Sequence, residues 1–150
     1  MSEAAAKQIA IDRLIKPFEG LRLEAYWDAI GGVWTIGYGH TGGVTPGQVI
    51  SQSQADAYLD YDVTWALANV ERYVSVVLNE NQFAALISFE FNTGAGRASR
   101  VFACVDNKDN EGAMNTLLLW DHDGNGNVIP GLLRRRQAEK ALFNAKPSQA

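Results

Sequence analysis

Three side chains near the N-terminus have the types and spacing for acid–base chemistry. Glu19 follows Phe18 at the end of a segment with helical periodicity, Asp28 lies nine residues further on, and Thr35 follows in a predicted strand. The negative end of a helix dipole and an apolar neighbour both disfavour a charged carboxylate, so we expect a raised pKa for Glu19. A carboxyl that is protonated near neutral pH is suited to act as a general acid.

Asp28 and Thr35 would supply what cleavage of a glycosidic bond by water requires. A glycoside hydrolase needs a second carboxylate across the scissile bond, and a neighbouring hydroxyl can orient the attacking water. A helix that ends at Glu19 and leads into a hairpin can bring these three groups around one cleft. A Glu and an Asp nine residues apart are more often surface charges, so the spacing alone leaves the function open.

The elements that must position these residues begin with a helix over residues 2–18. Pro17 weakens its last turn and Gly20 is suited to cap its C-terminus. Residues 21–44 are rich in glycine, aromatic and β-branched side chains, with a turn signal at Gly31–Gly32. This segment predicts a small antiparallel sheet.

Helices are expected to dominate the rest of the chain. Capping boxes at Ser51 with Gln54 and at Asn79 with Gln82 each predict the start of a helix. The expected helices, with a turn-rich break before the last, are 52–73, 83–91, 111–120 and 132–143. The pattern predicts an α+β fold, a mostly helical body with a small antiparallel β-sheet near the N-terminus.

Composition indicates one globular domain over residues 1–150, of which 47% are hydrophobic and 20% charged. No apolar run approaches the length of a membrane span, and charges interrupt the N-terminal segment, so we expect neither a membrane anchor nor a signal peptide. The net charge of −4 disfavours nucleic acid as a partner. The single cysteine, Cys104, excludes an internal disulfide and is expected to be a small buried residue.

Two charged segments allow a sharper and a plainer interpretation. The first is a run of three arginines, Arg134, Arg135 and Arg136. Either all three lie on a solvated helix face, or one of them points into an acidic site. Residues 121–126 match the first half of a calcium-binding loop, but its twelfth position is Leu132 instead of a glutamate, so a polar turn is expected. We expect no metal site and no cofactor.

The residues around Glu19 resemble the active-site segment of the phage-type lysozymes, the T4-lysozyme-like endolysins of glycoside hydrolase family 24. The resemblance runs in order and spacing from about Ile9 to Phe143. It rests on FEGLRLEAYWDAIGGVWTIGYGHTGG at residues 18–43, NQFAALISFEFNTGAG at 81–96, Trp120, and GLLRRRQAEKALF at 131–143. The resemblance implies a lysozyme-like fold.

On this resemblance, Glu19 is the general acid, while Asp28 and Thr35 position and activate the water. Phe91 and Asn92 match positions that line the saccharide cleft of the family, and Thr41 is a candidate sugar contact; Phe91 is equally well explained as core. The family cleaves the β-1,4 bond between N-acetylmuramic acid and N-acetylglucosamine.

The chain departs from the commonest family pattern between the second carboxylate and the threonine. The step from Asp28 to Thr35 is seven positions and not six, consistent with an extra residue at Gly31 or Gly32. A bulge can absorb such a residue, or it can displace Asp28.

Three further side chains have two interpretations each. His40 is a possible general base, but we expect it to pair with an acidic residue near Asp60 or Asp62. Glu90 is flanked by Phe89 and Phe91, but on a helix these neighbours need not bury it, so a solvated position is expected. Trp120 is expected in the core at a helix end, although aromatic side chains also stack on sugars.

The leading hypothesis is an endolysin: a monomeric muramidase with peptidoglycan as substrate, held in the host cytoplasm until a separate holin releases it to the periplasm and cell wall. A Gram-negative host fits the expected lack of a separate wall-binding domain. A lytic transglycosylase is the second hypothesis, which Asp28 and Thr35 argue against. The third is a catalytically inactive peptidoglycan-binding protein with a lysozyme fold.

Overall fold

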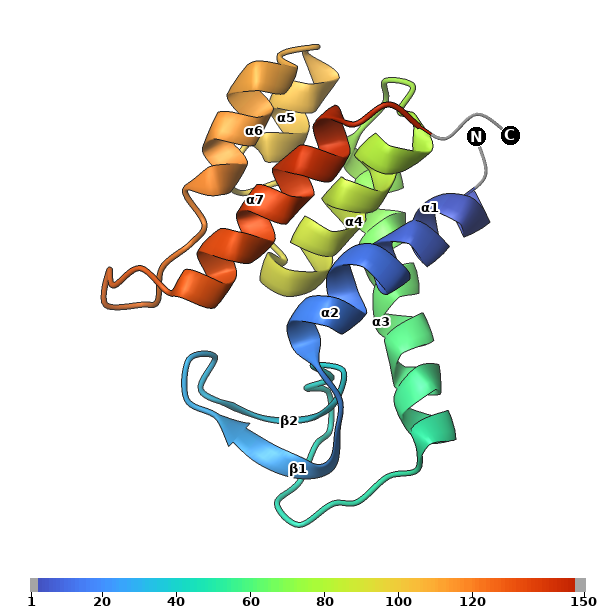
Figure 1. Ribbon diagram of the computed structural model, residues 1–150, viewed down its shortest axis with the longest axis vertical. Helices are drawn as coiled ribbons and strands as arrows, with labels where there is room; N and C mark the ends of the chain where they lie inside the picture. The colour runs from blue at the N-terminus through green and yellow to red at the C-terminus, as the bar shows by residue number, and fades with distance from the viewer. Residues whose placement is uncertain (1–2, 148–150) are drawn as a thin grey trace.

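The computed structural model describes residues 3–147. A small two-stranded antiparallel sheet packs at one end of a larger helical body, and the long helix α3 runs from one part to the other (Figure 1). The α+β prediction is confirmed. The helices and strands are α1 (Glu3–Ile9), η1 (Ala10–Ile15), α2 (Lys16–Glu19), β1 (Arg22–Asp28), β2 (Val33–Gly37), α3 (Gln52–Tyr73), α4 (Glu80–Thr93), α5 (Val101–Asp106), α6 (Asn110–Leu118) and α7 (Pro130–Asn144).

The expected first helix is helical from Glu3 onward, while its predicted first residue, residue 2, lies outside the described residues, and its hydrogen-bonding pattern changes along its length. Residues Ala10–Ile15 form a π-helical stretch between α1 and α2. Pro17 lies two residues after this stretch, in the first turn of α2, where it cannot donate a backbone hydrogen bond. The segment ends at Gly20, whose φ of 70° is a backbone conformation that glycine adopts readily.

Both predicted capping boxes are present. The Ser51 side chain accepts from the Gln54 backbone and opens α3, which ends at Tyr73 as expected. Asn79 and Gln82 make the same reciprocal pair at the start of α4, which is longer than predicted and ends at the left-handed Gly94. The short helix α5 was not predicted, because it has no side-chain cap and starts from Arg100 in a left-handed conformation.

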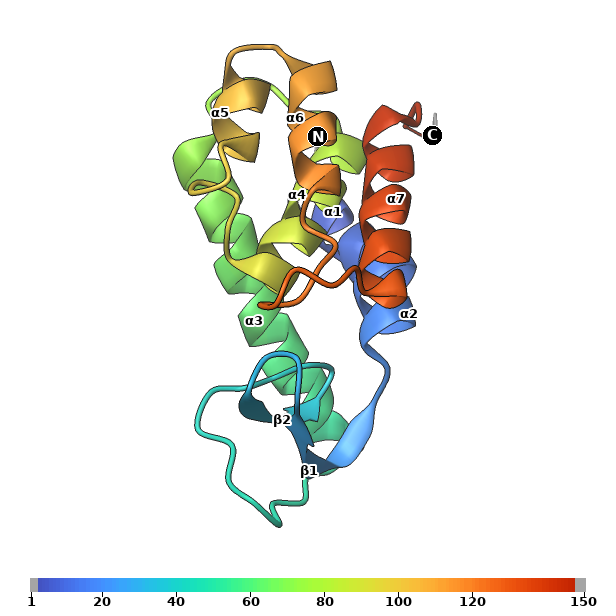
Figure 2. The same cartoon turned by 90° about the vertical axis from the view of Figure 1, so that its left-hand side faces the viewer.

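Helix α4 lies at the centre of the body, with α3, α7 and the N-terminal helical segment around it (Figure 2). Its buried side chains include Phe83, Leu86, Ile87 and Phe89, which belong to the main hydrophobic core. A second, smaller cluster of Ile36, Ile50 and Ala55 joins the sheet to the start of α3. In the described part of the chain, none of the helices is long and apolar enough to span a membrane.

Candidate active site

Glu19 is the last residue of α2, at the point where the helical segment turns into the sheet. Its side chain is 18% exposed. Gly39 approaches it closely: a Cβ at that position would lie 2.5 Å from Glu19 Oε1, and the φ of Gly39 is +82°. A larger residue at position 39 would strain the backbone and displace the end of the Glu19 side chain.

Asp28 ends β1 and opens the turn of the hairpin. Its Oδ1 accepts from Ile30 N over 3.0 Å and its carbonyl oxygen accepts from Gly32 N over 2.7 Å. The pair Asp28–Val33 then closes the turn, so residues 29–32 form the loop of the hairpin. The irregularity in strand pairing lies elsewhere, between Arg22 and Tyr26, so no bulge at the glycines is needed and Asp28 keeps its place in the ladder.

The strand register sorts the hairpin side chains onto two faces. Tyr26 pairs with Thr35, and Trp27 pairs with Trp34. Because directly paired residues share a face and successive residues alternate, Tyr26, Asp28 and Thr35 share one face, and the two tryptophans lie on the other. Thr35 is buried, and its hydroxyl donates to Val33 O over 3.2 Å.

The pKa of Tyr26 is affected by the charged groups near this face. Burial raises the pKa of Tyr26, and the nearby carboxylates of Asp28 and Glu19 raise it further, while Arg22 partly opposes them. The Arg22 guanidinium lies 4.5 Å from the centre of the Tyr26 ring. The pKa of the Tyr26 phenol therefore depends on the charges of both Asp28 and Glu19.

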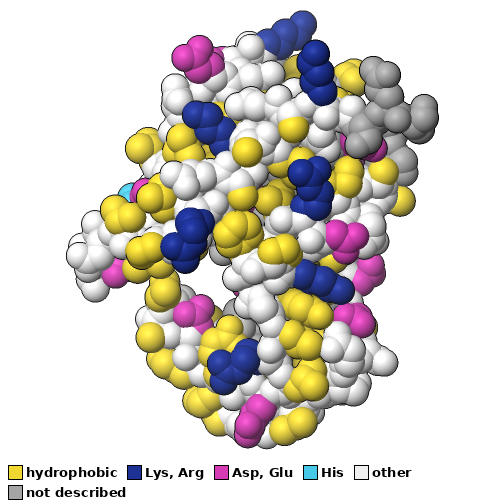
Figure 3. Space-filling view, viewed as in Figure 1, with side chains coloured by type: hydrophobic (Ala, Val, Ile, Leu, Met, Phe, Trp, Pro, Cys, Tyr) yellow, Lys and Arg dark blue, Asp and Glu magenta, His cyan; other side chains and the backbone are white. Residues whose placement is uncertain are grey.

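Glu19 and Asp28 line the same cleft, of about 650 Å³, between the sheet and the helical body. Figure 3 shows the surface hollowed there, with acidic and basic side chains at the rim. The cleft combines charged, polar and apolar groups, as a saccharide site requires. Its other lining residues are Pro17, Phe18, Ile30, Gly31, Asn92, Thr93, Trp120, His122, Ile129, Gly131, Leu132, Arg134 and Arg135.

The other three predicted site residues lie off the cleft lining. Thr35 is on the Asp28 face of the hairpin but buried behind it. Thr41 is exposed in the segment after β2. Phe91 is half-buried beside the core, 5.9 Å from the Arg135 guanidinium. Of the predicted residues, the structure thus brings Glu19, Asp28 and Asn92 together.

Arg135 is the arginine that contacts Glu19. Its Nη1 donates to Glu19 Oε2, and its side chain is only 3% exposed. This contact places a buried positive charge directly against the Glu19 carboxylate. Arg134 is exposed and lines the cleft, and Arg136 is buried.

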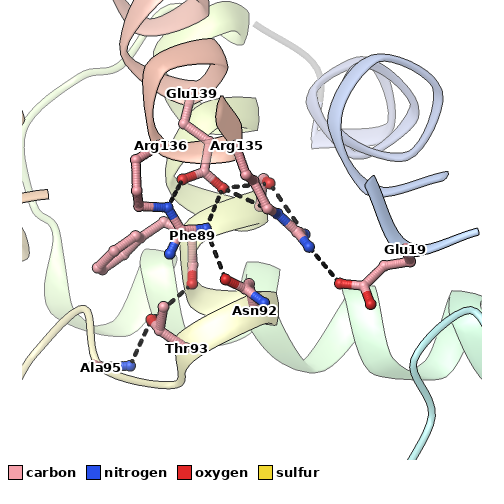
Figure 4. Close-up of polar contacts among 9 residues, drawn as sticks. Glu19, Phe89, Asn92, Thr93, Ala95, Arg135, Arg136 and Glu139 are labelled. Atoms are coloured by element: carbon pink, nitrogen blue, oxygen red, sulfur yellow. Dashed lines mark hydrogen bonds and ion pairs between the residues drawn. The ribbon is translucent and has the colours of Figure 1, made fainter. Parts of the chain in front are cut away.

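A buried network behind Glu19 joins α7 to α4 (Figure 4). The carboxylate of Glu139 lies 2.7 Å from Arg136 Nε and 3.5 Å from Arg135 Nε, and it accepts from Ser88 Oγ over 2.6 Å. Burial raises the pKa of Glu139 and lowers that of Arg136, and the ion pairs oppose both shifts. Sequence analysis did not single out Glu139; its spacing from the arginines on one helix was the available signal.

His40 pairs with the long helix as predicted. Its Nδ1 lies 2.7 Å from Asp62 Oδ2, its Nε2 lies 2.9 Å from Gly42 O, and its ring stacks on Tyr58 at 4.2 Å. Both ring nitrogens are therefore occupied within the protein. This arrangement favours the structural role over the general base.

Three expectations were wrong. Glu90 is buried and not solvated, because its carboxylate accepts from Asn69 Nδ2 over 3.0 Å and from Gly96 N over 2.9 Å. Trp120 is 39% exposed and lines the cleft, with only its edge contact to Phe89 directed at the core. Cys104 is half-buried at the edge of the core instead of enclosed in it.

Residues 121–126 form the expected polar turn. Asp123 Oδ1 accepts from the backbone of Asn125 and of Asn127, and these bonds lower the pKa of Asp123. Within residues 3–147, no group of three His, Cys, Asp or Glu side chains is arranged to hold a metal ion. The loop also places His122 at the cleft, a position that sequence analysis did not anticipate.

Comparison with known proteins places the chain among phage lysins. An endolysin of Acyrthosiphon pisum secondary endosymbiont phage 1 is 41% identical over 88% of this chain and 93% of the relative. An endolysin of Salmonella phage P22 is 38% identical over 86% of this chain and 91% of the relative. The chain matches only about half the length of the endolysin of Bacillus phage B103, at 40% identity.

Solved structures show the same likeness. The muramidase domain of SpmX from Asticaccaulis excentricus superposes with a TM-score of 0.80 at 36% identity, over 97% of both chains. An endolysin from Escherichia coli O157:H7 phage FAHEc1 gives a TM-score of 0.78 at 31% identity, over 99% of this chain and 98% of the other. A family model described as phage lysozyme matches residues 16–139, and the chain belongs to the phage lysozyme family.

Proposed function

We propose that this chain is an endolysin that hydrolyses the β-1,4 bond between N-acetylmuramic acid and N-acetylglucosamine in peptidoglycan. The observation that carries the proposal is the cleft in which Glu19 and Asp28 both lie, in a member of the phage lysozyme family. Relatives named endolysins support the peptidoglycan-lytic role.

Glu19 acts as the general acid in this proposal. It gives its proton to the glycosidic oxygen while the bond from that oxygen to C1 of the N-acetylmuramic acid breaks. The carboxylate that remains lies against the Arg135 guanidinium, which stabilises the negative charge as it develops. Arg135 thus assists proton transfer in the direction of cleavage.

Asp28 receives the proton of the attacking water. Its Oδ1 is engaged by Ile30 N, whereas among the described residues Oδ2 has no hydrogen-bond partner and remains open to a water. Thr35 is buried on the same face of the hairpin as Asp28 and donates to Val33 O, so in this proposal it helps to position the water from behind the cleft lining. The water adds to C1 from the face opposite the leaving group, with inversion of configuration.

The expected partners and location belong to the same proposal. The substrate is peptidoglycan, and the protein acts as a monomer that a separate holin releases from the host cytoplasm to the periplasm and cell wall. Arg134, at the arginine-rich start of α7, lines the cleft. Its positive charge would reduce the local repulsion between an anionic polymer and a chain whose net charge is −4.

The test is release of reducing ends from purified peptidoglycan by the wild type, Glu19→Gln and Asp28→Asn. We expect both variants to lose activity by orders of magnitude, and an NMR spectrum of the first product to show the α anomer. Anhydro products would indicate a transglycosylase, and wall binding without either product would indicate an inactive binding protein. Near-normal activity of Asp28→Asn would remove Asp28 from the mechanism.

A further inference from the structure

The Arg135 guanidinium has partners on two sides, contributed by three helices (Figure 4). Its Nη1 donates to Glu19 Oε2 of α2, and its Nη2 donates to Ser88 Oγ of α4 over 3.4 Å. Its Nε lies 3.5 Å from Oε2 of Glu139, which is one turn further along α7. The guanidinium thus lies between the proposed general acid on one side and a buried hydroxyl and carboxylate on the other.

Ser88 links Arg135 to Glu139. Its hydroxyl donates to Glu139 Oε2 over 2.6 Å, a separation typical of donation to a charged carboxylate. The single hydroxyl hydrogen is used there, so the Ser88 oxygen faces Arg135 with its lone pairs. A guanidinium can only donate and a carboxylate can only accept, so a group that does both is suited to join them. Ser88 is fully buried, so solvent does not compete for either bond.

Glu139 has a second partner that keeps it in place. Its Oε1 lies 2.7 Å from Arg136 Nε, and its Oε2 accepts from Arg136 Nη2 over 3.1 Å. Neither side chain of this pair is exposed. Separating a buried ion pair would leave each charge in the interior without its counterion, so the pair resists movement. Glu139 therefore anchors the Ser88 hydroxyl in one orientation.

Arg135 needs such an anchor when Glu19 carries its proton. The proposed mechanism starts from the neutral carboxyl group of Glu19 and produces the charged carboxylate. A neutral carboxyl group attracts a guanidinium less strongly than a carboxylate does. Arg135 also borders the open cleft, where solvent is available to its donors. Because a donor stabilises a developing charge best when it is already in place, Arg135 has to be held by a group other than Glu19.

We propose that Ser88, anchored by Glu139, is a positioning residue that holds the Arg135 guanidinium beside Glu19 while the Glu19 carboxyl group is protonated. The inference rests on the proposed function and adds to it the residue that prepares the site for proton transfer. The 3.4 Å contact between Arg135 and Ser88 is long for a hydrogen bond, because a charged Glu19 draws the guanidinium the other way. When Glu19 is neutral, this hydrogen bond shortens.

Crystal structures of two variants test the inference without any measurement of activity. Glu19→Gln places at residue 19 a side chain that has no charge, as the protonated acid has none. In this variant we expect Arg135 to keep its place, with the separation of Nη2 from Ser88 Oγ shortened from 3.4 Å to about 3.0 Å. In Glu19→Gln/Ser88→Ala we expect the guanidinium to turn into the cleft. An Arg135 that leaves its place in the single variant, or keeps it in the double variant, would overturn the inference.

Ser88→Ala in the otherwise unchanged chain gives a kinetic test. Alanine removes only the hydroxyl group and leaves the pair of Glu139 and Arg136 intact, so the variant should fold. Ser88 is not among the residues that line the cleft, so it should act on the rate and not on substrate binding. We expect kcat for reducing-end release to fall about tenfold, with KM within about twofold of the wild type.

Val105→Ala, in the buried face of α5, controls for lost stability. It should lower the melting temperature at least as much as Ser88→Ala does and keep kcat within about twofold. An unchanged kcat in Ser88→Ala, or an equal loss of kcat in Val105→Ala, would overturn the inference. A wild type that releases no reducing ends would overturn the proposed function, and the crystal structures would still decide what holds Arg135.

Discussion

Replacing Gly39 by alanine should impair catalysis much more than it impairs folding. Gly39 and Gly47 both have a φ of +82°, so alanine strains the backbone equally at the two positions. They differ in what the new methyl group meets: Glu19 Oε1 at 2.5 Å for residue 39, and nothing within 4 Å for residue 47. Gly47→Ala is therefore a control that is matched for backbone strain.

The size of the effect follows from these contacts. A left-handed backbone costs an L-residue about 1–2 kcal/mol, so the free energy of unfolding should fall by that amount in both variants. For a chain of this length the melting temperature would fall by about 2–8 °C. Real Cβ contacts stay beyond 3.0 Å, so a shift of at least 0.5 Å is needed, and the flexible end of the Glu19 side chain, which also contacts Arg135, is the group that can make it. Because a misplacement of 1 Å can cost about a hundredfold in rate, we expect kcat to fall about tenfold or more in Gly39→Ala.

The assay is the initial rate of reducing-end release at saturating peptidoglycan, together with thermal unfolding of each variant followed by circular dichroism. Gly47→Ala should keep kcat within about twofold of the wild type while showing the same loss of stability. Equal values of kcat for the two alanine variants would refute the reasoning, because they would mean that the position of the Glu19 carboxylate against Gly39 does not limit the reaction.

Other contacts give shorter tests. His40→Ala should lower the free energy of unfolding by about 1–3 kcal/mol, since it leaves Asp62 without its partner, whereas alanine at the half-exposed His122 should change it by less than about 0.5 kcal/mol in thermal unfolding. Asp28→Asn should lower the pKa of Tyr26 toward its ordinary value, because it removes a negative charge that opposes phenolate formation; NMR titration at alkaline pH would show the change, and an unmoved pKa would contradict it. Ser51→Ala should cost about 1 kcal/mol through loss of the α3 cap, seen as a lower urea midpoint.

The helices that begin with a side-chain cap could be predicted from the sequence, whereas a helix without such a cap could not. The capping boxes at Ser51 and Asn79 placed the starts of α3 and α4 correctly because side chain and backbone satisfy one another within one turn. Helix α5 lacks any side-chain cap and is held by the packing of Val101, Phe102 and Val105 in the core, which no local pattern records. The π-helical stretch before Pro17 likewise depends on a backbone adjustment that side-chain periodicity does not reveal.

Burial of charged and aromatic side chains was the hardest part of the site to predict. Glu90 was expected in solvent because a helix position between two phenylalanines need not face the core. Its burial follows from Asn69 of α3 and from the turn at Gly96, which meet it only in the folded chain. Trp120 was expected in the core because it is a large aromatic residue at a predicted helix end. It borders the cleft instead, because the chain leaves α6 there and turns toward α7.

The three consecutive arginines show most clearly why sequence could name candidates but not assign them. Successive residues of a helix point about 100° apart, so Arg134, Arg135 and Arg136 must face three different directions from α7. Because α7 packs against α4 and lies near α2, Arg134 faces the open cleft, Arg135 contacts Glu19 and Arg136 points into the core. Arg135 and Glu19 are 116 residues apart, so nothing local could select the middle arginine. Rotating α7 by one residue would deliver a different arginine to Glu19 and leave Glu139 facing another neighbour, so the packing of α7 against α4 decides which arginine the candidate active site receives.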